Sequence, residues 1–162
     1  MRSILPPMKT MILLAGMLLA SPVMAQHQAP PGTDPNQFKP LPDRNDVVSW
    51  KVLSQVELVK QKDRYVPQFA EAVAALDKKE VKVQGFMMPL QMGDKQSHFV
   101  LTAMPQTCSF CMPGGPETMV EVKTKAPVKY TFEPVVLTGK LAVLKDDPTG
   151  VFYRLTDAIP AK

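Results

Sequence analysis

The sequence predicts a mostly β fold, a small barrel or sandwich, and three observations support this prediction. Apolar and polar residues alternate with a period of two in five short runs, which Pro, Gly and Asp residues separate. Only one stretch has the spacing of a helix. The 162 residues suit one modest domain with unstructured ends. Because the strands do not alternate with helices, an α/β fold with a parallel sheet is not expected.

The N-terminal residues are expected to be removed. Arg2 and Lys9 form a basic head, residues 11–20 form a short apolar run, and Ala25 ends a small-residue cleavage motif. This layout is typical of a secretory signal peptide, and the apolar run is too short to span a bilayer. We therefore expect residues 1–25 to be a signal peptide cleaved after Ala25. No lipid-attachment cysteine follows the run, so the expected product is a soluble periplasmic protein without membrane insertion.

Residues 26–45 should form a proline-rich disordered tether. They contain five prolines and only two large apolar side chains, Phe38 and Leu41, too few to offset the entropy of ordering. His27 in this tether is expected to be solvated. Residues 46–162 should form a single β-barrel domain that opens with a short helix or irregular segment. Loss of the signal peptide lowers the formal net charge from +4 to +2, so nucleic acid is not an expected partner.

The expected helix precedes the main strands. It should begin at Pro67, because proline suits a first helical turn. Phe69, Val73 and Leu76 would then share one face at spacings i, i+4 and i+7. Lys78 and Lys79 follow, where a helix C-terminus favours positive charge.

Strands are expected on both sides of this helix. Val56, Leu58 and Tyr65 should contribute to a first strand. The five alternating runs are residues 81–85, 97–102, 119–123, 135–144 and 151–155. Gly139 marks a bulge or bend within the fourth run. Residues 146–150, Asp-Asp-Pro-Thr-Gly, predict a hairpin turn before the fifth.

Cys108 and Cys111 are the only cysteines, and their spacing allows both sulfurs to bind one ion, as in half of a tetrahedral zinc site. His98 on a neighbouring strand is a candidate third ligand, and Glu117 or Met112 is a weaker fourth. Copper(I) would favour the soft thioethers of nearby methionines, which are Met87, Met88, Met104 and Met112. Zinc and copper are therefore the candidate metals.

Two other interpretations of the cysteine pair stay open. The pair could be a thiol–disulfide redox pair, although residues 112–116 contain two prolines and two glycines and cannot continue as the helix that a thioredoxin fold requires. A permanent disulfide could instead clamp the loop in an oxidising compartment. The sequence lacks phosphate-loop, H-E-x-x-H and G-x-S-x-G motifs, so a non-enzymatic protein is expected.

Three segments resemble a known family. They are GFMMPL at residues 85–90, HFVL at 98–101 and CSFCMPGGPE at 108–117, within a resemblance that runs from about Trp50 to Asp157. The chain resembles an exported bacterial family, domain of unknown function 3299 (DUF3299). The resemblance implies an OB-like β-barrel of five or six strands, with one helix before the GFMMPL strand. It also implies exported relatives, some of them lipoproteins, associated in part with metal-dependent ABC transport.

Together these observations favour a soluble periplasmic accessory protein. It would handle zinc or copper, or dock to an envelope transporter or another envelope protein, through the loop that contains Cys108 and Cys111. A redox role for this pair and a disulfide-clamped binding module are the alternatives.

Overall fold

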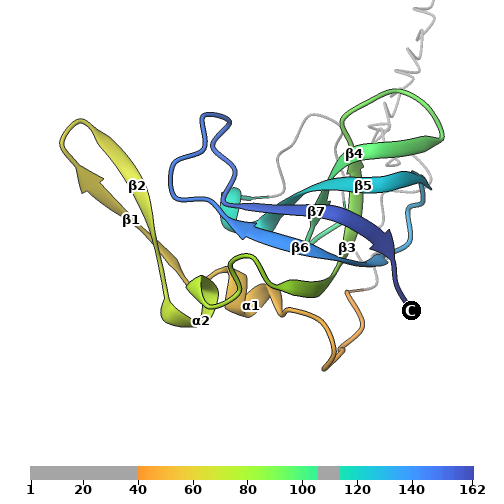
Figure 1. The fold of residues 1–162 in the computed structure, drawn as a ribbon, viewed down its shortest axis with the longest axis horizontal. Coiled ribbons are helices and arrows are strands. Elements are labelled where there is room, and N and C mark those ends of the chain that lie inside the picture. Colours follow the sequence, from red (N-terminus) through yellow and green to blue (C-terminus); the bar gives the residue numbers. More distant parts are fainter. Residues whose placement is uncertain (1–39, 106–113) are drawn as a thin grey trace, which may run out of the picture. The chain divides into compact units, whose positions relative to one another are not determined.

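The computed structural model describes residues 40–105 and 114–162, and within them five strands form a closed barrel while two form a separate hairpin (Figure 1). The strands are β1 (Val56–Gln61), β2 (Arg64–Phe69), β3 (Glu80–Pro89), β4 (Lys95–Thr102), β5 (Met119–Lys129), β6 (Val135–Val143) and β7 (Tyr153–Pro160). The helices are α1 (Trp50–Leu53), α2 (Glu71–Ala74) and the 3-10 turn η2 (Pro116–Thr118). The prediction of a mostly β barrel is confirmed.

The described ranges do not reach the predicted signal peptide or most of the predicted tether, so both stay predictions. Within residues 40–105 and 114–162, no helix is long and apolar enough to cross a membrane.

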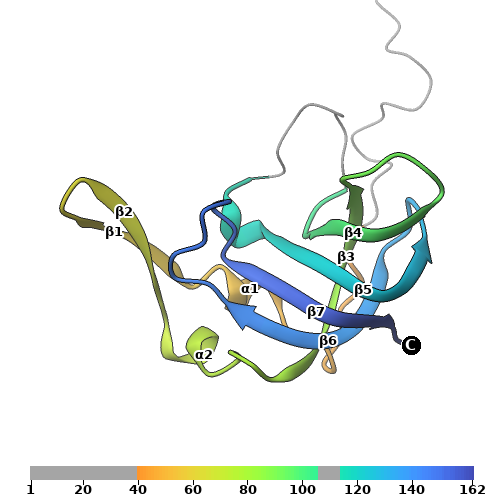
Figure 2. The same ribbon diagram turned by 45° about the horizontal axis from the view of Figure 1, so that its top comes forward.

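The barrel strands follow one another in space as β3, β4, β5, β7 and β6, and β6 pairs again with β3. All pairs are antiparallel except β5 with β7. β7 therefore lies between β5 and β6, as Figure 2 shows. If the five barrel strands are numbered 1 to 5 along the chain, their order around the barrel is 1-2-3-5-4, with one parallel pair. This is the arrangement of an OB-fold.

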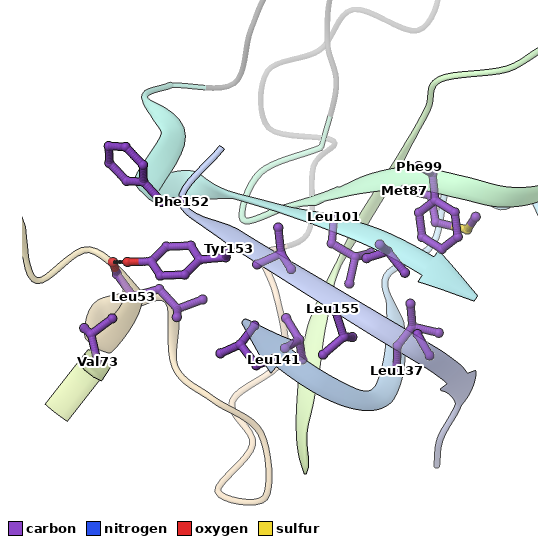
Figure 3. Packing of buried hydrophobic residues seen from close by; sticks show 14 residues of the cluster. Leu53, Val73, Met87, Phe99, Leu101, Leu137, Leu141, Phe152, Tyr153 and Leu155 are labelled. Carbon is purple, nitrogen blue, oxygen red and sulfur yellow. Dashed lines mark hydrogen bonds between the residues drawn. The ribbon is translucent and has the colours of Figure 1, made fainter. Parts of the chain in front are cut away.

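The core fills the inside of the barrel (Figure 3), because each strand turns every second side chain inward. Its largest fully buried side chains from the barrel strands are Phe99, Leu101, Leu137, Leu141, Tyr153 and Leu155. The hydroxyl of Tyr153 donates a hydrogen bond to the backbone oxygen of Leu53, with the two oxygens 2.5 Å apart. This bond attaches α1 to β7 at one end of the barrel.

The hairpin β1–β2 contacts the barrel through its base. The ring of Phe69 packs against Phe152 and Tyr153, with centroid distances of 5.7 and 5.8 Å. Val56, which pairs with Phe69, also packs against the core. Further along the same face, Leu58 and Tyr65 are 59% and 66% exposed.

The predicted helix start at Pro67 is wrong. Pro67 and Phe69 belong to β2, and the α-helix covers only Glu71–Ala74. Within the described residues, no further strand pairs with the hairpin, and such an edge position tolerates the missing N–H of proline. Val73 and Leu76 do pack in the core, as their spacing suggested.

The irregularity predicted at Gly139 is present, but the extra residue lies in the neighbouring strand. Thr138 pairs with Ile159, whereas Lys140 pairs with Thr156, so β7 has one more residue than β6 at this point. Asp157 adopts a left-handed conformation there, with φ of 54°. Gly139 is thus the residue opposite a bulge in β7.

Candidate functional site

A row of charged side chains crosses the outer wall of the barrel, with Glu121 of β5 at its centre. One carboxylate oxygen of Glu121 lies 2.8 Å from Nε2 of His98, and the other lies 2.5 Å from Nε of Arg154. Nη2 of Arg154 also donates to Asp147, at 3.0 Å. We call His98, Glu121, Arg154 and Asp147 the charged row.

The strand register explains why these residues meet. Glu121 pairs directly with Arg154 across the parallel strands β5 and β7. On its other side, Glu121 pairs with Val100 of β4, and His98 lies two residues before Val100 on the same face. Asp147 comes from the loop between β6 and β7. The row therefore joins three strands and one loop.

The central carboxylate is largely shielded from water, since the Glu121 side chain is 11% exposed. Burial alone would raise the pKa of Glu121, but the hydrogen bonds from Arg154 and His98 outweigh this effect and lower it. Lys123, with its Nζ 3.8 Å away, adds to the lowering. Hydrogen bonds from Thr149, and then from Arg154, lower the pKa of Asp147. Both carboxylates are thus held in their charged form.

These shifts predict acid sensitivity. A carboxyl group whose folded pKa is lowered stabilises the fold fully above its unfolded pKa, and that stabilisation is lost as the pH falls through the folded pKa. For Glu121, whose ordinary pKa is 4.5, the loss should begin near pH 4.5 and grow below it. Urea unfolding between pH 7 and pH 3 should therefore show a shallower decrease in Glu121→Gln than in the wild type. Parallel curves would contradict this role for Glu121.

His98 is held in one orientation by the row. An ionised carboxylate only accepts hydrogen bonds, so Nε2 of His98 must donate to Glu121. In the neutral ring this leaves Nδ1 as the unprotonated nitrogen. Among the described residues, Nδ1 has no hydrogen-bond partner, and the side chain is 36% exposed. A histidine whose second nitrogen binds a carboxylate is the usual form of a histidine that ligates metal.

Glu117, the other described candidate ligand, lies elsewhere. It belongs to η2, directly before β5, and its carboxylate folds back over Gly115. Burial raises the pKa of Tyr153, and the negative charge of Glu117 raises it further. The turn η2, which carries Glu117, contacts α1. Met119 pairs with Thr102, four residues from His98, a separation of about 13 Å along the strand. The structure does not bring His98 and Glu117 together.

A family model described as a protein of unknown function (DUF3299) matches residues 25–156. The chain belongs to the DUF3299 family. It is also similar to the crystal structure of a DUF3299 family protein from Pseudomonas aeruginosa PAO1, with a TM-score of 0.47 and 22% identity over 59% of this chain and 68% of that chain. No curated protein matches it. The resemblance noted in the sequence is confirmed, but family membership implies no activity, so the function rests on the site's chemistry.

The remaining candidate ligands of this DUF3299 protein, Cys108, Cys111 and Met112, lie outside the described residues. Across residues 40–105 and 114–162, no three His, Cys, Asp or Glu side chains are grouped so that they could hold a metal ion. Of the other methionines considered for copper, Met87 is a core residue and Met104 is 64% exposed.

The sequence did not reveal Glu121, Arg154 or Asp147 as site residues of the DUF3299 protein. Glu121 occupies an outward position in the run Met-Val-Glu-Val-Lys, which resembles any solvent-facing strand residue. The only local signal was a charged residue at mid-strand between two buried valines, Val120 and Val122. Its partner Arg154 is 33 residues away in the chain.

Proposed function

We propose that this DUF3299 protein is an exported, non-enzymatic accessory protein that binds zinc or copper outside the cytoplasm. Cys108 and Cys111 supply two thiolates, and His98 supplies a ring nitrogen. The metal would be exchanged with an envelope transporter or another envelope protein. The observation that carries the proposal is the orientation of His98: its Nε2 is bound by Glu121, and its Nδ1, which has no hydrogen-bond partner among residues 40–105 and 114–162, is the ligand atom we propose.

The chain length is compatible with this ligand set. Cys108 follows Thr102 by six residues, which can span up to about 20 Å. The distance from the end of β4 back to the level of His98 is about 13 Å. Since Glu117 points to a different part of the barrel, the fourth ligand would be Met112 or water. Thiolate and imidazole ligands suit both zinc and copper, and a thioether would favour Cu(I).

The proposal is tested by titrating the reduced, purified protein with Zn²⁺ and with Cu(I). We expect a dissociation constant of about 1 μM or lower for at least one of them. Cys108→Ser should abolish this affinity, and His98→Gln should weaken it by about tenfold or more. His27→Gln is the matched control, because that histidine lies in the predicted tether, and its affinity should equal that of the wild type.

Weaker binding than this, or binding that Cys108→Ser leaves intact, would refute metal handling. The state of the cysteines after export would then decide between the alternatives. A disulfide with a reduction potential below about −300 mV would indicate a structural clamp, and a higher potential would support a redox pair.

A further inference from the structure

A second surface lies at the opposite end of the paired strands β4 and β5 from Thr102 and Met119. Two loops meet there, residues 90–94 between β3 and β4 and residues 130–134 between β5 and β6 (Figures 1 and 2). They present large apolar side chains to solvent: Leu90 is 49% exposed, Met92 100% and Phe132 84%. We call these three residues the loop patch. Large apolar side chains exposed on two neighbouring loops suit a contact surface.

The loop that carries Met92 is held by a buried side chain. Gln96 is fully buried, and its amide nitrogen donates to the backbone oxygens of Gln91 and Gly93, at 3.1 and 2.6 Å. These two residues flank Met92 directly. The exposure of Met92 is therefore a property of a fixed loop conformation.

The second loop is fixed to the first. The backbone N–H of Tyr130 donates to the backbone oxygen of Asp94, at 2.8 Å. The ring of Phe132 packs edge-on against Tyr130, with centroids 5.1 Å apart. Because both loops are already ordered, a partner that covers Met92 and Phe132 would not have to offset the entropy of ordering them.

Charged residues surround the loop patch, two of each sign: Asp94, Lys95, Lys129 and Glu133. All four are exposed, and none has an ion-pair partner within the described part of the chain. Lys95 and Lys129 even pair directly across β4 and β5, where like charges are unfavourable. A rim without net charge gains little from an anionic membrane, whereas a surface that carries both signs can complement itself.

We propose that the loop patch is the contact surface of a symmetric dimer of this chain. A twofold axis brings each patch against its copy, so Met92 and Phe132 of both protomers form the apolar centre. The same axis places the rim lysines of one protomer near the rim carboxylates of the other. An apolar, aromatic and methionine-rich centre with a polar rim is the usual composition of a protein interface.

Sedimentation equilibrium of the purified protein tests this proposal. The wild type should be a dimer at about 100 μM, and Met92→Ser combined with Phe132→Ser should raise the dissociation constant by about tenfold or more. The double variant should nearly keep the melting temperature of the wild-type monomer, measured at low concentration, because Met92 is fully exposed and Phe132 is 84% exposed, although the ring contact of Phe132 with Tyr130 is lost. Leu58→Ser with Tyr65→Ser is the control, since these two large side chains are also more than half exposed, at 59% and 66%, but lie on the hairpin, and this variant should remain a dimer.

A wild type that is monomeric at about 100 μM would overturn the proposal, as would a dimer that survives the loop-patch substitutions. Co-sedimentation with anionic vesicles that depends on Met92 and Phe132, with a monomeric protein, would also overturn it and identify lipid as the occupant.

Discussion

Gly139→Ala should lower the free energy of unfolding by about 3 kcal/mol. A methyl group at this position of β6 would lie 2.7 Å from the backbone oxygen of Thr156 and 3.1 Å from Cα of Ala158, both in β7. Neither backbone atom can move without disrupting the pairing of β6 with β7. Urea unfolding can be followed by the fluorescence of Trp50, the only tryptophan, whose N–H donates to the backbone of Gln84 in β3.

Gly150→Ala is a suitable comparison for this variant. Gly150 has a φ of 78° but nothing within 4 Å of the position of an added methyl group. Gly150→Ala should therefore lower the free energy of unfolding only by the strain of an alanine in a left-handed backbone conformation, about 1 kcal/mol. Equal losses in the two variants would show that the close approach of β6 and β7 at Gly139 is not what requires the glycine.

Arg154→Ala should lower the free energy of unfolding by about 2 kcal/mol, between the values usual for exposed and for buried ion pairs. The Arg154 and Glu121 side chains are 23% and 11% exposed, so the carboxylate left behind is only partly reached by water. Adding Glu121→Gln should recover part of the loss, because it removes the unpaired charge. The same urea unfolding experiment at pH 7 measures both variants.

Arg64→Ala provides the matched control. Arg64, like Arg154, makes two hydrogen bonds to carboxylate oxygens, but both go to Asp146, at 2.7 and 3.1 Å, and the Arg64 and Asp146 side chains are 62% and 67% exposed. An ion pair in water contributes little, so this variant should unfold almost like the wild type. If Arg64→Ala and Arg154→Ala lost equal stability, the shielding of Glu121 would not be the cause.

The barrel strands could be predicted from the sequence because their signal is local. One face of each strand is buried, and that burial imposes the alternation along Val81, Val83 and Met87, for example. The prediction of the helix start was wrong because Phe69, Val73 and Leu76 all pack in the core at helical spacing, although Phe69 reaches the core from a strand. Spacing reports which residues are buried and only indirectly which backbone conformation buries them.

The charged row could not be predicted from the sequence, for a different reason. Glu121 meets His98 and Arg154 only because β5 pairs with β4 on one side and with β7 on the other. Pairing between strands is a property of the closed barrel, and no motif along the chain records it. His98 could be proposed as a ligand from its residue type, but the carboxylate that orients it could not.

The position of β7 between β5 and β6 has a consequence for how the protein is made. Every other barrel strand precedes β7 in the chain, so β5 and β6 keep open edges until residues 153–160 have been synthesised. Open edges are sites of aggregation and of proteolytic attack. A chain truncated before β7 would therefore leave one edge of β5 and one edge of β6 unpaired.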